Sequence, residues 1–466
     1  MTEEDLLHGD TYRDRVSTVT KDGSRNWVYA LKPKGDLYQY RKYLAYIYLA
    51  VFFIMPFIKV NGLPFMMANV VEGKFILFSK IFWPQDFFIF AIGMIAFIVF
   101  IVLFTVIFGR IFCGWVCPQT VFLEFVFRPI EWLIEGSPSQ QRKIDVSSDN
   151  SKYLKKVVKH LIYIAISFLI AHTFLSYVLG LDQVIRIIKE PLSEHLGLFG
   201  GLVVFTALFY SVFAFVREIV CTTICPYGRL QGVMVDQDTM QVSYDYKRGE
   251  PRARLKKSEV RTAGDCIDCF KCVQVCPTAI DIRDGVQMEC VGCTACIDAC
   301  DEVMDAIHLD RGLIRYASEN EIAEGKKQPI TTKIKAYSIL LVILLIVMSG
   351  MIASRKSIDN YISRASGQLY HTTPKGDISN LFELKSINKT KDHVDIQLRV
   401  KDMDATVKFV GQDSVLLKPE YINTFSFFIE IPKAKVTNYS TTIAIEVLHD
   451  GQVIDVVKTN FIGPFN

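Results

Sequence analysis

Eight of the twelve cysteines form two runs with the same spacing. In each run, two residues separate successive members of a group of three cysteines, and a fourth cysteine follows after three more residues. A turn with this spacing wraps three thiolates around one face of a [4Fe–4S] cluster, and the fourth cysteine reaches the other cluster of the pair. We therefore predict two ligand sets: Cys266, Cys269, Cys272 and Cys300 for one cluster, and Cys276, Cys290, Cys293 and Cys296 for the other. The chemistry expected of these residues is one-electron transfer.

Disulfide pairing and zinc binding are the alternatives for these eight cysteines. Disulfide frameworks are typical of small secreted domains, and zinc motifs pair two cysteines before a longer gap. Neither pattern fits three cysteines at consecutive two-residue gaps in two successive runs. The second run ends in Cys300-Asp301 where the first ends in Cys276-Pro277, and this difference removes no ligand.

The other four cysteines form two Cys-x3-Cys-Pro motifs. They are Cys113, Cys117 and Pro118 in the first motif, and Cys221, Cys225 and Pro226 in the second. Arg110 and Arg217 stand just upstream. If the preceding helix continues, the two thiols of a motif share one helix face, too far apart for a relaxed disulfide. Soft thiolates favour Cu(I), zinc or iron–sulfur. Three interpretations stay open: one site shared by four thiolates, one redox or copper-handling pair in each motif, and four inert buried residues.

Long apolar stretches precede both motifs, and half of the 466 residues are hydrophobic. Crossing a bilayer takes about 20 residues. Five stretches qualify as α-helical spans, at 43–60, 87–108, 161–179, 198–216 and 336–353. The first is the weakest, because Pro56 and Lys59 lie near its end. The first four spans form two copies of a two-helix unit that ends in a Cys-x3-Cys-Pro motif. A parallel repeat of this kind predicts pseudo-twofold packing about the membrane normal.

Lysine and arginine gather in alternate connections, and this bias predicts the orientation of the spans. Basic segments precede the first span, join the second to the third, and flank the two cysteine runs. Residues 61–86 and 181–197 hold only two basic residues each. No secretory signal peptide opens the chain. We therefore expect a multi-pass inner-membrane protein with its N-terminus and its cysteine runs in the reducing cytoplasm and its C-terminus outside.

The C-terminal region, residues 375–466, contains no cysteine and alternates apolar with polar side chains. Clear examples are the segments 394–400, 425–431 and 442–448, the last followed by the turn pair Asp450-Gly451. Period-two segments separated by turns predict an antiparallel β-sandwich, and about 90 residues suit an immunoglobulin-like fold.

The expected organisation is a multidomain chain with five parts. They are a cytoplasmic N-terminal segment at 1–40, a four-helix membrane domain at 41–240, a ferredoxin-like α+β domain with two [4Fe–4S] clusters at 241–330, a fifth transmembrane helix at 331–355, and an all-β domain at 356–466.

This layout resembles the FixG/RdxA/CcoG family of membrane ferredoxins, accessory proteins of cbb3-type cytochrome oxidase. The resemblance covers essentially the full chain, including the motifs at 113–118 and 221–226 and the runs at 266–300. It implies a role in maturing the oxidase, by reduction of Cu(II) to Cu(I) for its binuclear centre. It also implies a periplasmic immunoglobulin-like domain. By the same resemblance, the residues expected to handle copper or pass it electrons are Cys113, Cys117, Cys221 and Cys225.

Two other functions remain open. A quinol dehydrogenase, similar to the membrane ferredoxins that supply periplasmic nitrate reductase, would share the Cys-x3-Cys-Pro motifs. A non-enzymatic assembly scaffold or redox sensor would hold oxidase subunits together. The sequence has no P-loop and no flavin motif, so we expect a separate donor, either cytoplasmic or a quinol. The resemblance implies the oxidase and copper-delivery proteins as partners. The net charge of +3 argues against nucleic acid, and the repeat leaves a homodimer open.

Overall fold

A computed structural model describes residues 25–70, 73–147, 150–255, 262–325, 330–365, 367, 369–390, 392–411, 415–419, 421–436 and 438–464. The chain forms two compact units, Met1–Met348 and Ser349–Asn466. Most of the predicted segment 1–40 therefore lies outside the described residues. The finer division into five parts stays a prediction.

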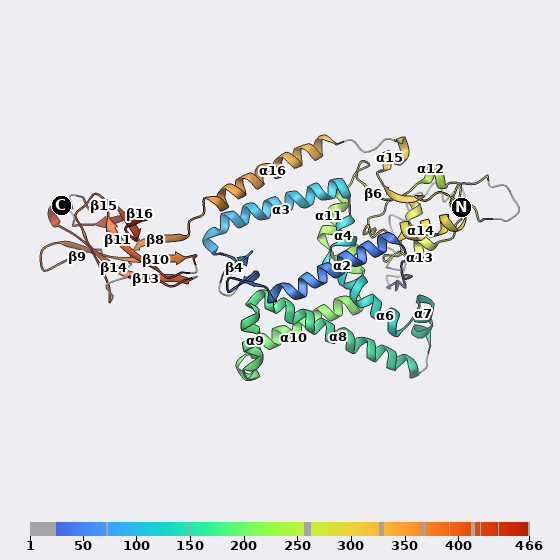
Figure 1. Cartoon of the computed structure of the whole chain (residues 1–466), viewed down its shortest axis with the longest axis horizontal. Helices are drawn as coiled ribbons and strands as arrows, with labels where there is room; N and C mark the ends of the chain where they lie inside the picture. The colour runs from blue at the N-terminus through green and yellow to red at the C-terminus, as the bar shows by residue number, and fades with distance from the viewer. Residues whose placement is uncertain are drawn as a thin grey trace. The chain divides into compact units, whose positions relative to one another are not determined.

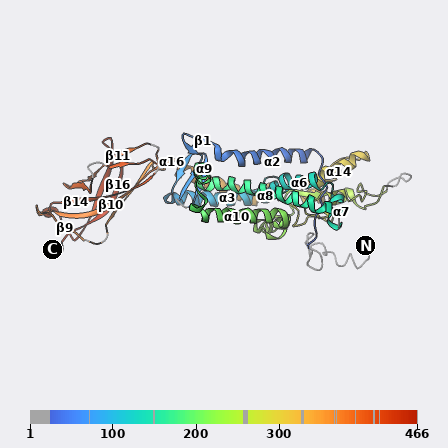
Figure 2. The same cartoon turned by 90° about the horizontal axis from the view of Figure 1, so that it is seen from below.

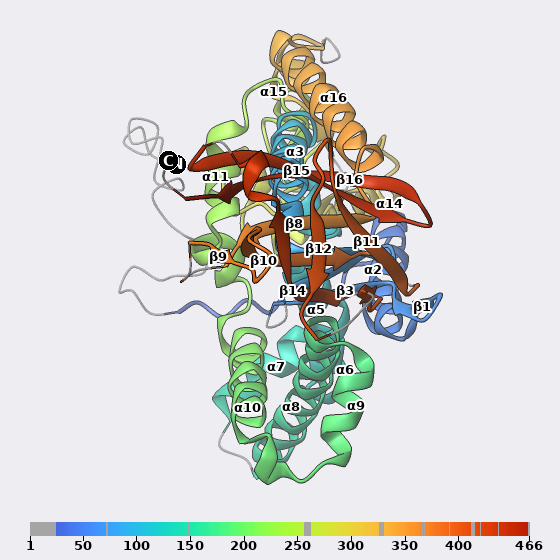
Figure 3. The same cartoon turned by 90° about the vertical axis from the view of Figure 1, so that its left-hand side faces the viewer.

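Long helices form the body of the first unit (Figure 1). They are α2 (Asp36–Ile54), α3 (Phe87–Phe108), α8 (Asn150–Leu179), α10 (Leu196–Ser211) and α16 (Thr332–Ala353), the last of which continues past the unit boundary. In Figures 1 and 2, α2, α3, α8 and α10 extend between a small β-sheet at one end and the cysteine-rich region around α14 (Ala295–Ala306) at the other. Figure 3 shows α8 and α10 side by side, with α9 (Leu181–Lys189) next to them.

Shorter elements complete the first unit. Around the small sheet they are η1 (Met55–Phe57), β1 (Lys59–Val60), β2 (Leu63–Pro64), β3 (Met66–Asn69), β4 (Lys74–Leu77), β5 (Lys80–Phe82), η2 (Pro84–Asp86) and η4 (Leu192–Glu194). Around the two motifs they are α4 (Ile111–Trp115), α5 (Pro118–Phe122), η3 (Leu123–Phe127), α6 (Arg128–Ile134), α7 (Pro138–Val146), η5 (Val212–Val216), η6 (Val220–Ile224) and α11 (Pro226–Met234). Around the cysteine runs they are β6 (Gln241–Tyr244), α12 (Tyr246–Gly249), α13 (Lys271–Gln274), η7 (Ile282–Asp284), β7 (Ile314–Ala317) and α15 (Glu319–Glu324).

Five helical segments of the described chain are long and apolar enough to cross a membrane. They are Phe87–Phe108, Ile111–Ile134, Lys152–Leu179, Leu196–Val216 and Thr332–Ala353. Four of these segments overlap predicted spans, and the predicted span 43–60 is not among them. The predicted span 43–60 corresponds to α2, which begins earlier and ends at Ile54, and strand β1 starts at Lys59. Arg41, Lys42 and several tyrosines dilute the apolar character of α2.

The segment Ile111–Ile134 was expected to be a connection. It is apolar and helical, but it is interrupted at Pro118 and contains the π turn η3. Its parts α4 and α6 lie at the same end of the unit as α14 (Figure 1). The first motif is therefore held at the cysteine-rich end of the long helices.

The second unit is an antiparallel β-sandwich, as predicted. Its strands are β8 (Ile358–Arg364), β9 (His371–Thr372), β10 (Ile378–Asn388), β11 (Val394–Val400), β12 (Thr406–Phe409), β13 (Val415–Leu417), β14 (Tyr421–Ile431), β15 (Ser440–His449) and β16 (Gln452–Ile462), with the 3₁₀ turn η8 (Lys433–Lys435). One sheet has the order β12-β14-β10-β8, with β9 on β10, and the other has the order β13-β11-β15-β16. Asp450 and Gly451 take φ of +48° and +76°, as a tight hairpin turn requires.

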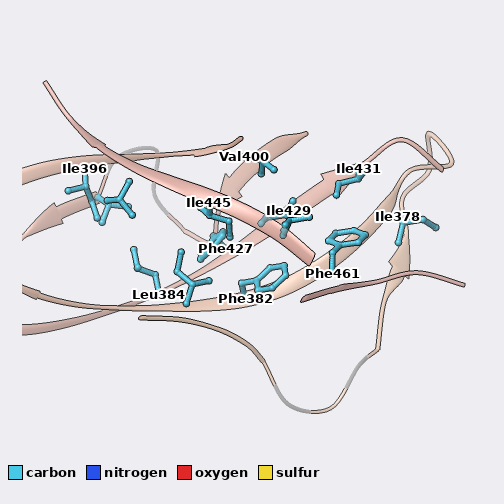
Figure 4. Packing of buried hydrophobic residues seen from close by; sticks show 14 of the residues in the cluster. Ile378, Phe382, Leu384, Ile396, Val400, Phe427, Ile429, Ile431, Ile445 and Phe461 are labelled. Carbon is cyan, nitrogen blue, oxygen red and sulfur yellow. The ribbon is translucent and has the colours of Figure 1, made fainter. Parts of the chain in front are cut away.

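Apolar side chains from both sheets fill the space between them (Figure 4). Phe382 and Phe427 stack with ring centroids 5.8 Å apart, and Ile445 and Phe461 meet them from the other sheet. Their alternation along each strand is the period of two that the sequence shows. The two groups of cysteines that the sequence singles out all lie in the first unit.

Candidate iron–sulfur and thiol sites

The two cysteine runs fold as matching loop–helix segments beside the β6–β7 pair. In each run the residue two positions before the third cysteine is left-handed: Phe270 has φ of +57° and Thr294 has φ of +62°. Each of these residues is the N-cap of the helix that carries the third cysteine, α13 or α14. The left-handed residue reverses the chain. It thereby allows cysteines from the loop and from the helix to face one cavity.

Two cavities lie among these segments, and their linings divide the eight cysteines into two groups. The lining of the first cavity includes Cys276, Cys290, Cys293 and Cys296, which we call the proximal thiol set. The lining of the second cavity includes Cys266, Cys269, Cys272 and Cys300, which we call the distal thiol set. Cys272 reaches both cavities. In each group the fourth cysteine of one run joins the first three of the other, which is the crossover that the spacing predicts.

The spacing of the thiols fits a polynuclear cluster better than a single ion. All twelve cysteines are described and free of disulfides. A tetrahedral zinc ion bound at about 2.3 Å would bring its sulfurs to about 3.8 Å from one another. Among the described residues, one group of three possible metal ligands has its ligand atoms within 4.8 Å of one another, and it consists of Glu190, Glu194 and His195. No three cysteine sulfurs of the described residues lie this close together. Two cavities surrounded by wider-spaced thiols suit [4Fe–4S] clusters, which would accept and donate one electron each.

Burial controls the chemistry of the thiols in these cavities. It raises the pKa of Cys272 to about 12, and the carboxylate of Asp281 acts in the same direction. Burial likewise raises the pKa of Cys300 to about 12. Such thiols keep their protons at neutral pH unless a metal displaces them. The protein would therefore release protons when its metal is inserted.

The Cys-x3-Cys-Pro motifs adopt matching backbone turns, and neither motif continues the helix before it. Gly109 ends α3 at φ +56° and ψ −126°, and Arg217 ends η5 at φ +55° and ψ −121°. Glycine adopts this conformation without strain, whereas Arg217 needs its surroundings to hold it. The equivalent positions are Gly109 and Arg217, so Arg110 matches Glu218 and not Arg217.

Hydrogen bonds within the two motifs follow one pattern. The N–H groups of Cys113 and Cys221 each donate to the carbonyl three residues earlier at 3.0 Å. The N–H groups of Cys117 and Cys225 donate to the carbonyl five residues earlier, at 3.0 Å and 2.7 Å. A five-residue step is the wide turn of a π-helix, a local form found at functional sites. The condition under which the two thiols would share one regular helix face, a helix that continues through the motif, is therefore not met.

The prolines of the motifs begin new helices. Pro118 is the first residue of α5 and Pro226 the first residue of α11, positions where a missing N–H costs nothing. Cys117 and Cys225 are consequently the N-cap residues of these helices. The second cysteine of each motif is thus fixed at the junction between the wide turn and the helix that follows it.

The two motifs pack across each other. Cys113 Sγ donates to Gln231 Oε1 in α11 at 3.2 Å, and Gln119 Nε2 donates to the Arg217 carbonyl at 3.1 Å. Cys221 also interacts electrostatically with the thiols of the first motif. We call the group that results the thiol quartet: Cys113, Cys117, Cys221 and Cys225.

The first motif touches the loop of the proximal thiol set. A Cβ atom on Gly114 would stand 2.7 Å from Cys293 Cα and 2.8 Å from Val291 O. On the other side of the contact, a Cβ atom on Gly292 would stand 2.9 Å from Arg110 O. Atoms this close leave no space for a side chain at either glycine. The quartet and the proximal thiol set are therefore joined by direct backbone contact.

A buried network of ion pairs surrounds the second motif. Its pairs are Arg128–Glu124 at 2.7 Å, Arg217–Glu131 at 2.6 Å, Lys159–Glu135 at 2.8 Å and Arg25–Glu218 at 2.9 Å. Four cations face four anions, so burial leaves no excess charge in these pairs. Buried pairs are costly to break, because the remaining partner stays desolvated. The network holds the strained Arg217, and with it the start of the second motif.

Sequence reasoning missed three residues that assemble this region. Arg41 counted only as an orientation signal, but it is buried and its Nε donates to the Gly114 carbonyl at 2.6 Å. Asp298, between two predicted ligands, accepts from the N–H of Tyr38 at 2.7 Å and anchors α2 to α14. Gln231, which contacts Cys113, carried no sequence signal. The sequence signal that could have pointed to Arg41 is the position of two charged residues, Arg41 and Lys42, at the edge of an apolar helix.

Comparisons with known proteins cover all three regions. A model of a 4Fe-4S binding domain matches residues 90–135, and a model of a 4Fe-4S dicluster domain matches residues 216–319. A model described as the IG-like fold at the C-terminal of FixG, putative oxidoreductase, matches residues 348–464. The match at 216–319 includes both cysteine runs, and each of the first two matches includes one Cys-x3-Cys-Pro motif.

Three curated relatives align over most of the chain. Protein RdxA of Cereibacter sphaeroides is 30% identical over 367 residues, which cover 76% of this chain and 77% of that protein. Protein RdxB of the same organism is 29% identical over 419 residues, 86% of this chain and 88% of the relative. Nitrogen fixation protein FixG of Rhizobium meliloti is 30% identical over 314 residues, 64% of this chain and 58% of the relative. With its apolar helices and cysteine-lined cavities, the chain is an iron–sulfur electron-transfer protein of the membrane and belongs to the FixG/RdxA/CcoG family.

Proposed function

We propose that this protein reduces Cu(II) to Cu(I) at the thiol quartet, with electrons from two [4Fe–4S] clusters, for assembly of the copper centre of a cbb3-type cytochrome oxidase. The distal and proximal thiol sets are the proposed cluster ligands. The proposed catalytic residues are Cys113, Cys117, Cys221 and Cys225. The observation that carries the proposal is the contact of Gly114 with Cys293, which brings the quartet next to the proximal set.

The arrangement of the cysteines supports one order of electron transfer. Cys269 of the distal set is exposed, whereas Cys293 of the proximal set is buried. Cys293 belongs to a cluster of buried residues against which Cys113 and Cys221 pack. A donor would therefore meet the distal set first, and the quartet would receive electrons from the proximal set. Each electron reduces one Cu(II) to Cu(I). Two clusters that hold one electron each would therefore reduce two copper ions in one reduction cycle.

The chemistry of the quartet suits copper as the substrate. Thiolates are soft ligands that stabilise Cu(I) over Cu(II), so binding itself favours reduction. The sulfurs are too widely spaced for a preformed tetrahedral ion, whereas a two-coordinate Cu(I) needs only two of them. The matching turns and crossed contacts of the motifs support the proposed two-helix repeat and a single shared site.

The proposed orientation places the thiol sites in the cytoplasm and the β-sandwich in the periplasm. Basic residues on the cysteine-rich side of the spans support it. In this orientation the proposed role of the outer unit is to dock the oxidase or a copper-delivery protein. A separate cytoplasmic donor or a quinol would reduce the distal set.

A test in cells separates electron transfer from scaffolding. Replacing Cys290 and Cys293 by alanine in a host with a cbb3-type oxidase should remove most oxidase activity and lower the copper content of the oxidase, because the proximal set is lost. The measurement is oxidase activity and copper per haem in isolated membranes, with the protein level checked by immunoblot. Normal oxidase at a normal protein level would favour the scaffold. Rapid reduction of the purified protein by a quinol analogue, without copper reduction, would favour the quinol dehydrogenase.

A further inference from the structure

Two buried arginines lie beside the proximal thiol set, and neither pairs with a carboxylate of the described residues. Arg41 is 1% exposed, its Nε donates to Gly114 O at 2.6 Å, and its Nη2 has no hydrogen-bond partner. Gly114 is the residue in backbone contact with Cys293. Within the described part of the chain, Arg41 forms no ion pair. A buried guanidinium is unfavourable unless an anion offsets its charge.

Arg110 lies beside the same set and contacts a different segment of its loop. It is 9% exposed, and it donates to the carbonyls of Met288 and Gly228. Met288 precedes Cys290 by two residues. These acceptors are neutral, and no carboxylate pairs with Arg110 among the described residues. The positive charges of Arg41 and Arg110 therefore both remain available to the proximal set.

The acidic groups near the proximal set do not cancel these charges. Glu124 is close enough to Cys293 for its charge to act on that thiol, and it forms an ion pair with Arg128 at 2.7 Å. Glu289 adjoins Cys290 in the chain. Because Arg128 offsets the charge of Glu124, the balance around the proximal set is two arginines without an ion pair among the described residues against one glutamate, Glu289.

The distal set has the opposite balance. Its arginine, Arg283, is bound by Asp281 at 2.5 Å and 2.8 Å and by Asp268 at 2.6 Å. A third carboxylate, Asp301, directly follows Cys300 and interacts with its thiol. Lys271 also lines the distal cavity, but it is partly exposed and lies 3.6 Å from Glu302, which offsets its charge. One buried arginine therefore faces three aspartates around the distal set. This arginine and these aspartates are partly or fully buried, so water screens their charges less than it screens surface charges.

We infer that this uneven distribution of charge gives the cluster of the proximal set a higher reduction potential than the cluster of the distal set. Reduction adds one negative charge to a cluster, and the net charge around a cluster is one of the main determinants of its potential. Unpaired arginines favour that added charge and aspartates oppose it. Electrons that enter at the distal set are then drawn toward the thiol quartet. The inference rests on the cluster assignment of the proposed function, and it does not depend on copper as the acceptor.

The test is a redox titration of the full-length protein, purified without oxygen and followed by EPR. Cys269→Ser, at the exposed distal ligand, identifies the distal signal. We expect the proximal cluster to have the higher potential. Arg41→Gln and Arg110→Gln should each lower it by at least a tenfold change in the one-electron equilibrium constant, about 59 mV. Arg41→Lys, which keeps the positive charge, should leave the potential of the proximal cluster close to the wild-type value, even though the contact with Gly114 changes.

Arg311→Gln is the matched control, because Arg311 is an exposed arginine of the same region that pairs with Asp305. It should shift neither potential. Iron and sulfide analysis of every variant shows whether both clusters are present. Intact clusters with a higher distal potential, or with potentials that Arg41→Gln and Arg110→Gln leave unchanged, would overturn the inference. Absence of clusters from the wild-type protein would instead overturn the proposed function.

Discussion

Replacing Cys113 and Cys221 together by alanine should reduce the rate of Cu(II) reduction by more than about 100-fold and leave both [4Fe–4S] clusters in place. Loss of a supporting group around a metal site typically costs 10–100-fold, and here two sulfur ligands are removed. Neither residue lines the cavities of the proximal or distal sets, so cluster content should not change. The measurement is Cu(I) formation by the reduced protein with a Cu(I)-specific chelator, alongside iron and sulfide analysis.

Thr223→Ala is the matched control for this double variant. Thr223 lies in the second motif between Cys221 and Cys225, and its side chain contacts only that of Thr222 among the hydrogen bonds of the described residues. Its removal should leave copper reduction close to that of the wild-type protein. Wild-type activity in the Cys113→Ala, Cys221→Ala protein would remove the quartet from the mechanism, whatever the state of the clusters.

Gly114→Val should uncouple the quartet from the proximal thiol set. The added Cβ would stand 2.7 Å from Cys293 Cα and 2.8 Å from Cys293 N. Both are backbone atoms, so the loop or the motif must move apart. Overpacking of this kind costs about 1–3 kcal/mol, and the gap it opens lies in the path between sulfur groups. We expect oxidation of the reduced clusters by Cu(II) to slow by more than about 10-fold, measured by stopped-flow absorbance.

Gly200→Val provides the comparison, since a Cβ atom on Gly200 in α10 would meet nothing within 4 Å. Both substitutions place a β-branched residue in a helix, and only one meets the proximal loop. If Cu(II) oxidises the reduced clusters of the Gly114→Val protein as fast as those of the Gly200→Val protein, with both clusters intact, electrons do not pass through the contact between the first motif and Cys293.

Features set by local sequence could be predicted well. The helix α3 has the predicted bounds, because the 22 residues from Phe87 to Phe108 carry no charge. Strand β11 also matches its predicted segment, Val394–Val400, because one face of it is buried and alternation is visible. The assignment of the cysteines to two clusters came from spacing alone and stays a prediction.

Features set by contacts between distant residues could not be predicted. Arg41 and Gly114 are 73 positions apart, and nothing near either residue shows that they meet. The positive φ of Arg217 depends on its buried pair with Glu131, so the break before the second motif has no glycine to mark it. The predicted bounds of the helix at 43–60 were wrong, because the apolar run was extended through Pro56. Residues after Ile54 form a 3₁₀ turn and a strand.

The most direct test of the electron path is the yield of Cu(I) from a single reduction cycle. The protein is fully reduced, freed of excess reductant without oxygen, and mixed with excess Cu(II). Two electrons stored per chain should give two Cu(I) per chain, while the EPR signals of both reduced clusters disappear. Reduced clusters that persist with Cu(II) present, or Cu(I) formed in the same amount by protein without iron and sulfide, would contradict transfer from the clusters through the quartet to copper.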